Sequence, residues 1–192
     1  ISEVLSDTSV QMSQGEIIQI SSSFDAGQSI REYFYRINCK TALLIAASAQ
    51  LGAVACGAPS SIYLPLRRYG HNVGMAFQIT DDILDMIAEQ GQLGKPVGGD
   101  LRQGIITLPV IYALSRCEDK KRLADLVVKV HKSDDEVEEA LEIVRNCGAI
   151  EYSFNIANKY IAKAKAELSN LPDLPTRVTM GMAADFVIAR KF

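Results

Sequence analysis

Three aspartates stand in an otherwise apolar helical segment, and they constrain the fold more than any other feature of the sequence. The segment is Val73–Ile87, and its acidic residues are Asp81, Asp82 and Asp85. Burying an unpaired carboxylate is costly, so a chain that groups three of them needs a cation to meet them. Residues three and four apart share a helix face, so the three side chains are expected to converge. Oxygen ligands without His or Cys favour Mg²⁺ over zinc. The alternative is an acidic face in solvent, without a ligand.

A glycine-rich loop with one lysine follows directly, at Gly91–Asp100. Such loops let the backbone and Lys95 approach an anion, and Mg²⁺ usually completes its shell with water and phosphate oxygens. The loop is not a Walker A motif, because Glu89 occupies its first glycine position and Pro96 follows the lysine. A phosphorylated ligand is therefore indicated, with a plain turn between helices as the alternative.

A second basic site lies in the apolar segment Tyr33–Ala55, where Arg36 and Lys40 are one helical turn apart. A lysine at the end of an apolar helix can simply extend its ammonium group into water. The functional interpretation is a second clamp for a diphosphate, in which the hydroxyl group of Thr41 assists Lys40.

These segments together resemble the trans-isoprenyl diphosphate synthase (polyprenyl synthetase) family. The resemblance depends on Lys40–Thr41, on Gly74–Asp85 (GMAFQITDDILD) and on Gly94–Pro109 (GKPVGGDLRQGIITLP). The three blocks occur in the family's order and at similar separations, and Gln14–Gln19 is a weaker fourth match. The likeness runs the length of the chain. It looks like the medium- and long-chain bacterial enzymes, such as the large subunit of heptaprenyl or hexaprenyl diphosphate synthase.

Two departures from the family pattern matter. Family members carry two aspartate-rich motifs on facing helices, and this chain has only the second. Because the sequence starts at Ile1, without Met and inside a helical pattern, we interpret it as a C-terminal portion that lacks the N-terminal helices. The second departure is Ile105, which stands where many relatives have a lysine that contacts the allylic diphosphate.

The resemblance implies an all-α fold, the C-terminal portion of an isoprenoid-synthase-type helical bundle, with residues 1–192 as a single domain. The hydrophobic pattern agrees, because apolar residues recur three and four positions apart and no segment alternates as a strand does. The helices are expected at 1–24, 29–56, 60–90, 105–116, 118–131, 134–147, 149–169 and 173–190. Ser133 is expected to cap the helix that begins at 134.

The activity that the resemblance implies is prenyl transfer. An allylic diphosphate ionises, the double bond of isopentenyl diphosphate attacks the allylic cation, and a proton is lost. Mg²⁺ on Asp81, Asp82 and Asp85, together with Lys40 and Lys95, would neutralise the leaving diphosphate. The product would be a medium or long all-trans polyprenyl diphosphate.

An apolar wall would keep water away from the allylic cation. It is expected from Ala42, Leu43, Ala46, Met75, Phe77 and Ile79. Phe77 and Gln78 would place a π face and an amide oxygen beside the cation and the alkene. Plain core packing is the alternative for Phe77. The residues expected to act in catalysis are Lys40, Thr41, Gln78 and Lys95.

Two other classes of function stay open. The chain could be a non-catalytic or regulatory subunit of a heteromeric prenyl diphosphate synthase, one that contributes the second motif to a partner. A terpene cyclase is disfavoured, because cyclases normally replace the second aspartate cluster with an Asn/Ser/Glu pattern. The family leads us to expect a homodimer or a heterodimer.

The composition narrows the partners and the compartment. A net charge of −3 argues against nucleic acid, whose phosphate backbone calls for a basic patch. The four cysteines are scattered and have no paired His, so neither a zinc site nor a disulfide framework is expected; they are Cys39, Cys56, Cys117 and Cys147. We therefore expect the protein in a reducing cytoplasm. No segment is expected to cross a bilayer, because the most apolar run, 42–58, is short and interrupted. Peripheral membrane contact stays open, since a long prenyl product has to reach lipid.

Overall fold

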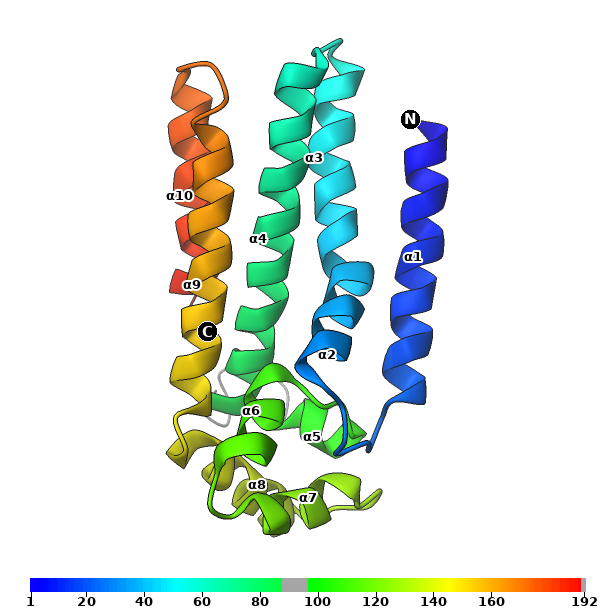
Figure 1. The fold of residues 1–192 in the computed structure, drawn as a ribbon, viewed down its shortest axis with the longest axis vertical. Coiled ribbons are helices and arrows are strands. Elements are labelled where there is room, and N and C mark those ends of the chain that lie inside the picture. The colour runs from blue at the N-terminus through cyan, green and yellow to red at the C-terminus, as the bar shows by residue number, and fades with distance from the viewer. Residues whose placement is uncertain (88–96, 191–192) are drawn as a thin grey trace. The chain divides into compact units, whose positions relative to one another are not determined.

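The computed structural model describes residues 1–87 and 97–190, and these residues form helices and no strand. Each range expected to be helical contains a helix, so the all-α prediction is confirmed (Figure 1). The elements are α1 (Ser2–Ser21), α2 (Ile30–Ile37), η1 (Asn38–Ala42), α3 (Leu43–Ala55), α4 (Ser60–Ile87), α5 (Gly99–Gln103), α6 (Leu108–Arg116), α7 (Lys120–Val128), α8 (Asp134–Asn146), α9 (Ala149–Leu168) and α10 (Pro175–Ala189).

Two of these elements were not expected. The helix α5 has five residues, which is too short to show a hydrophobic period. The segment η1 is a π-helical turn that joins α2 to α3 without a break. Turns of this kind are rare and occur frequently at functional sites, and this one contains Lys40 and Thr41.

The chain divides into two compact units. Unit 1 comprises Ile1–Ile17, Tyr35–Gln78 and Ile156–Lys191, and unit 2 comprises Ile18–Phe34 and Ile79–Asn155. The boundary falls inside α4, so this helix contributes its first part to unit 1 and its acidic end to unit 2.

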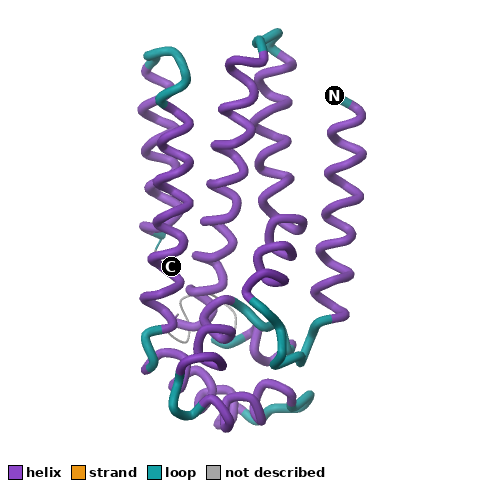
Figure 2. Tube along the Cα trace, in the orientation of Figure 1, coloured by secondary structure: helices purple, strands orange, loops and turns teal. Residues whose placement is uncertain are grey.

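In unit 1, α4 packs against α9 and α10, and the axes of the three helices are nearly parallel in Figure 2, with α9 running opposite to the other two. The hydroxyl group of Tyr69 donates a hydrogen bond of 2.8 Å to the carbonyl oxygen of Met180. α4 also lies close to η1, because a Cβ atom at Gly74 would be 2.7 Å from Cα of Ala42. The core cluster of this unit comprises Tyr69, Ala76, Ile161, Ala164, Leu168, Ala184 and Val187.

In unit 2, the helices α6, α7 and α8 contact one another. Their fully buried side chains include Leu108, Val110, Leu123, Leu126, Val127 and Leu141. Ser133 begins α8 with a capping box: its hydroxyl oxygen accepts a hydrogen bond from the backbone N–H of Glu136, whose carboxylate accepts one from the N–H of Ser133. The cap expected at Ser133 is confirmed.

A disulfide joins Cys117 and Cys147 in unit 2, contrary to the expectation of no disulfide. Cys117 directly follows α6, and Cys147 directly follows α8. The two residues are 30 positions apart, and only the packing of α6 against α8 brings them together. A separation of this length leaves no local signal in a sequence without CxxC motifs.

The helical run Ile30–Ala55 is long and apolar enough to cross a membrane by length and composition alone. This corrects the expectation that no segment is long and apolar enough to cross a bilayer. The sequence analysis started the apolar run at Ala42, whereas the helical run in the structure starts at Ile30. Helices in the cores of soluble proteins meet the same criteria, and within unit 1 the run has six buried residues. These are Arg36, Ile37, Cys39, Ala42, Ala46 and Ala47.

Candidate functional site

The acidic end of α4 lies in unit 2, and its three aspartates have different surroundings. Asp81 is exposed, Asp85 is half-buried, and Asp82 is buried with 5% of its surface exposed. The hydroxyl group of Tyr33, itself fully buried, donates a hydrogen bond of 2.7 Å to Oδ2 of Asp82. A buried carboxylate with a charge-assisted hydrogen bond has a fixed orientation. Tyr33 therefore sets the direction in which Asp82 presents its other oxygen.

Asp85 binds the backbone at the end of the glycine-rich loop, where α5 begins. Its Oδ1 accepts a hydrogen bond from the N–H of Gly99 and its Oδ2 one from the N–H of Asp100, both at 3.1 Å. Its carbonyl oxygen accepts a third, of 3.0 Å, from the N–H of Gly98. The carboxylate thus satisfies the first N–H groups of α5, as a capping side chain does. The sequence analysis assigned Asp85 to a metal alone and missed this contact.

Mg²⁺ is the ion that the carboxylates predict. Within residues 1–87 and 97–190, no group of three or more His, Cys, Asp or Glu side chains is arranged to hold a metal. Mg²⁺, however, is usually held by one or two carboxylates plus substrate phosphates and water, rather than by a cage of protein ligands. Asp81 and Asp85 both have solvent-accessible surface, so the donor chemistry fits Mg²⁺ with a bound phosphate. The metal-ligand roles of the three aspartates stay predictions.

Four of the predicted site residues, Lys40, Thr41, Phe77 and Gln78, lie in unit 1 on η1 and α4. Lys40 forms an ion pair with Glu16 of α1, with 3.0 Å between Nζ and Oε2. Both side chains are partly exposed, and ion pairs of this kind contribute little to stability, so Lys40 can exchange its partner for a phosphate at small cost. The hydroxyl group of Thr41 donates a hydrogen bond of 2.7 Å to Oε1 of Gln78. The structure therefore brings Thr41 and Gln78 together.

Phe77 belongs to the core of unit 1. Its ring packs against the core cluster, and the guanidinium carbon of Arg190 lies 4.1 Å from the ring centroid. The Nη2 atom of Arg190 also donates a hydrogen bond of 3.3 Å to the carbonyl oxygen of Phe77. One face of the ring thus already meets a cation. A role of Phe77 beside the substrate stays a prediction.

Two predicted contacts have no test in the structure. Lys95 lies outside the described residues. The expected convergence of Lys40 with the aspartates joins residues of different units, and it stays a prediction.

Ile105, which stands where many relatives have a lysine, is half-buried. Its N–H donates a hydrogen bond of 2.8 Å to the carbonyl oxygen of Asp100.

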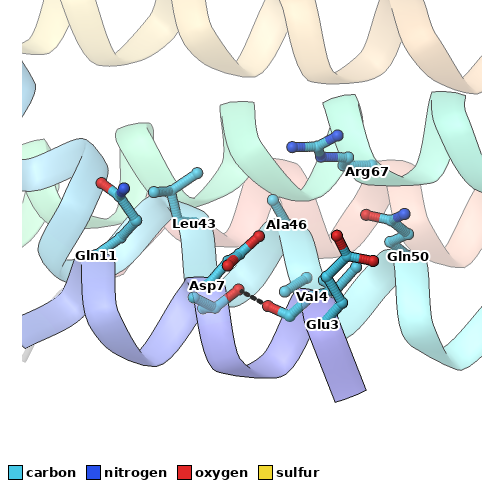
Figure 3. A pocket seen from close by; sticks show the side chains of 10 residues that line it. Glu3, Val4, Asp7, Gln11, Leu43, Ala46, Gln50 and Arg67 are labelled. Atoms are coloured by element: carbon cyan, nitrogen blue, oxygen red, sulfur yellow. Dashed lines mark hydrogen bonds between the residues drawn. The ribbon is translucent and has the colours of Figure 1, made fainter. Parts of the chain in front are cut away.

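A cavity of about 420 Å³ lies in unit 1 between α1, α3 and α4 (Figure 3). Leu43 and Ala46, two members of the predicted apolar wall, line it. The polar side chains of its lining include Arg67, Glu3, Asp7, Gln11 and Gln50. In Figure 3, Gln11 lies beside Leu43, at the end of the cavity away from Arg67. Leu43 and Ala46 thus form the apolar part of a lining that also contains charged side chains.

The all-helical fold is that of the isoprenyl diphosphate synthases. The structure matches that of heptaprenyl diphosphate synthase from Staphylococcus aureus with a TM-score of 0.92 and 32% sequence identity, over 100% of this chain and 60% of that one. It matches polyprenyl synthase from Caulobacter crescentus CB15, complexed with calcium and isoprenyl diphosphate, with a TM-score of 0.93 and 33% identity, over 99% of this chain and 58% of that one.

The family model described as polyprenyl synthetase matches residues 1–144. The chain belongs to the polyprenyl synthetase family, as the resemblance predicted. It is 42% identical over 189 residues to heptaprenyl diphosphate synthase component 2 of Bacillus subtilis (strain 168), covering 98% of this chain and 54% of that protein. It is 44% identical over 186 residues to the Geobacillus stearothermophilus protein of the same name, covering 97% and 57%. The chain thus spans little more than half the length of these relatives.

Tyr33 was missed by the sequence analysis, because an aromatic residue in the apolar run before Lys40 carries no local signal of a polar partner. Replacing it with phenylalanine leaves the buried Asp82 carboxylate without this donor. We expect Tyr33→Phe to lower the free energy of unfolding by about 1–3 kcal/mol. Urea unfolding followed by circular dichroism measures the change. Phe34→Leu, at the adjacent half-buried ring, is the control for loss of aromatic packing, and an equal loss in both variants would contradict a special role of the hydroxyl group.

Proposed function

We propose that the chain belongs to a trans-prenyltransferase that condenses isopentenyl diphosphate with an allylic prenyl diphosphate, giving a medium or long all-trans polyprenyl diphosphate. The observation that carries the proposal is the acidic end of α4, where Asp82 is buried and oriented by Tyr33 while Asp81 is exposed beside it. A helix that only packs in a protein core does not need a buried carboxylate beside an exposed one. A site that binds a metal cation and a diphosphate does need such carboxylates.

In this proposal the aspartates Asp81, Asp82 and Asp85 hold Mg²⁺, which when bound supplies positive charge against the leaving diphosphate. Lys40 exchanges Glu16 for a diphosphate oxygen, and Lys95 provides a second ammonium group. Charges that are already in place where the leaving group becomes more negative lower the barrier, because they need no reorganisation during the step.

Thr41 and Gln78 act as one hydrogen-bonded unit. Because the Thr41 hydroxyl group donates to Gln78 Oε1, the amide of Gln78 has a fixed orientation, and its N–H₂ group points away from Thr41. This supports a role in which Thr41 positions Gln78 and Gln78 contacts the substrate. The apolar part of the cavity at Leu43 and Ala46 supports a place for the prenyl tail, away from water.

The partners follow from the same proposal. The Bacillus subtilis and Geobacillus stearothermophilus relatives are named as component 2 of a heptaprenyl diphosphate synthase, which supports a heterodimer with a second component. A homodimer is the alternative, and light-scattering mass with and without a candidate partner separates them. We place the protein in the cytoplasm, with peripheral membrane contact for release of a long product. No nucleic acid takes part.

The test is a chain-elongation assay with labelled isopentenyl diphosphate and allylic primers of increasing length. The chain is assayed alone and as a chimera joined to the part of the Bacillus subtilis relative that lies outside the matched 189 residues. We expect Mg²⁺-dependent elongation by the chimera, and its loss on Asp82→Ala. Elongation in neither form, with normal diphosphate binding, would favour the non-catalytic or regulatory subunit of a heteromeric synthase instead.

Lys95→Ala provides a separate check of the diphosphate clamp. Loss of one hydrogen bond to a charged group is expected to weaken diphosphate affinity by about 10- to 100-fold. The affinity for a prenyl alcohol, which lacks the diphosphate, should stay the same. Isothermal calorimetry measures both, with Lys120→Ala, an exposed lysine of α7, as the matched control. Equal losses for the diphosphate and the alcohol would contradict the assignment.

A further inference from the structure

The disulfide between Cys117 and Cys147 fixes α6 to α8 in unit 2. The Cα atoms of the two residues are 5.6 Å apart, within the usual range for a disulfide. The bond closes a loop that contains the whole of α7 and α8, since the cysteines directly follow α6 and α8. The other two cysteines are free thiols, Cys39 buried and Cys56 exposed.

The sulfur pair lies beside open space. Both cysteines line a cavity of about 660 Å³ that is otherwise lined mostly by charged side chains of α6, α7, α8 and the connection between α6 and α7. A cavity of this size admits a small thiol or disulfide reagent. Cys147 is half-buried and Cys117 has 6% of its surface exposed, so attack at Cys147 is the favoured route. The pair therefore meets the requirement of access for thiol–disulfide exchange.

α8 also supports the segment that Asp85 binds. A Cβ atom at Gly98 would lie 2.8 Å from Cγ1 of Val137 and 3.3 Å from Cδ1 of Leu141, so α8 packs directly on the backbone of Gly98. Gly98 in turn donates its N–H to the carbonyl oxygen of Asp85, at 3.0 Å. A shift of α8 therefore acts on the residues that hold Asp85.

Two polar contacts add to this support. Nε of Arg145 on α8 donates a hydrogen bond of 2.7 Å to the carbonyl oxygen of Met86, next to Asp85. Arg102 of α5 forms an ion pair of 2.8 Å with Asp134 at the start of α8. The helix α8 thus contacts the end of α4 at Met86, and Gly98 and Arg102 at the two ends of α5.

We propose that Cys117 and Cys147 are a reversible thiol–disulfide pair that controls how firmly the segment 97–103 holds Asp85. Oxidation by a small disulfide such as glutathione disulfide converts the two thiols and the reagent into the protein disulfide and two glutathione thiols. The two electrons and two protons of the cysteine thiols pass to the reagent. In a cytoplasmic protein, a disulfide is usually transient and redox-sensing. Control of diphosphate binding through Asp85 rests on the proposed function, whereas the exchange reaction does not.

The first experiment follows the redox state of the pair. The 192-residue chain carrying Cys56→Ser, which removes the exposed free thiol, is equilibrated in glutathione buffers of varied oxidised-to-reduced ratio. Free thiols are trapped with a maleimide and the mass is measured. We expect two thiols to disappear together within one molecule, and peptide mapping to assign them to Cys117 and Cys147. Two thiols that stay free in every buffer, or a bond to another cysteine, would overturn the proposal.

The second experiment measures the consequence for the segment 97–103. The oxidised chain is expected to melt about 4–12 °C above the reduced chain, from the usual stabilisation by a disulfide. Amide hydrogen exchange in residues 97–103 should be slower in the oxidised chain. The Cys117→Ser, Cys147→Ser double variant should behave as the reduced chain in every buffer. Exchange rates in 97–103 that do not depend on the redox state would refute the link to Asp85.

Inorganic diphosphate with Mg²⁺ is the probe for the site itself. We expect oxidation to tighten its binding by about fivefold or more, a typical coupling between two sites. Equal affinity in both redox states would refute the regulation but leave the proposed function intact. Binding in neither state would count against the proposed function, while the thiol titration and hydrogen exchange would still decide the redox proposal.

Discussion

The Asp81→Ala variant is expected to lose Mg²⁺-dependent diphosphate binding while it keeps its helix content and stability. Asp81 is exposed on α4, and substitutions at such positions usually change stability by no more than about 0.5 kcal/mol. Removing a residue that only orients a metal ligand already costs about 10- to 100-fold in affinity, so removing a ligand should cost at least as much. Calorimetric titration with inorganic diphosphate, with and without Mg²⁺, measures the loss.

Asp125→Ala is the matched control for Asp81→Ala. Asp125 is also an exposed aspartate on a helix of unit 2, on α7. The control variant should bind diphosphate as the unchanged chain does. Normal Mg²⁺-dependent binding by Asp81→Ala would show that this carboxylate is a solvated surface charge, the alternative that the sequence left open.

Gly104→Ala is expected to produce a large loss of stability in unit 2. Gly104 has a φ of +72°, and an added Cβ would lie 2.5 Å from ring atoms of Phe24. A left-handed backbone costs a residue with a Cβ about 1–2 kcal/mol, and overpacking adds about 1–3 kcal/mol. The expected loss in the free energy of unfolding is therefore about 2–5 kcal/mol, measured by urea unfolding.

Gly148→Ala separates the two costs. Gly148 has a φ of +76°, and nothing lies within 4 Å of an added Cβ. The control variant should pay only the backbone cost, so it should lose about 1–2 kcal/mol. Equal losses at Gly104 and Gly148 would mean that the ring of Phe24 moves aside, and that its packing on Gly104 does not stabilise the unit.

The helices could be predicted from the sequence because their apolar faces recur with the helical period and their ends carry ordinary caps. The capping box at Ser133 and Glu136 is such a local signal. The helix α5 could not be predicted, because five residues are too few for a period and its start is stabilised by Asp85 from another helix. Contacts of this kind depend on tertiary packing, which a local pattern does not contain.

The same limit applies to the site. The residue types and the spacing indicated that Asp81, Asp82 and Asp85 carry the chemistry. The partner of Asp82, however, is Tyr33, 49 positions earlier, and it lies in a segment whose pattern indicates only burial. The disulfide between Cys117 and Cys147 was missed for the same reason: packing of two helix ends creates it, and the spacing of the cysteines does not reveal it.

The π-helical turn at Asn38–Ala42 makes the length of this segment matter for the site residues that it contains. A π turn contains one residue more than the α-helical turn it replaces. Because the π turn already accommodates one extra residue, deleting a single residue there would restore regular α-helical winding and keep the faces of α2 and α3 aligned. Ala46 and Ala47, now buried, would then keep their places in the core. The loss would fall on the turn itself, which contains Lys40 and Thr41, so the extra residue is expected to matter for these two side chains and little for the packing of α3.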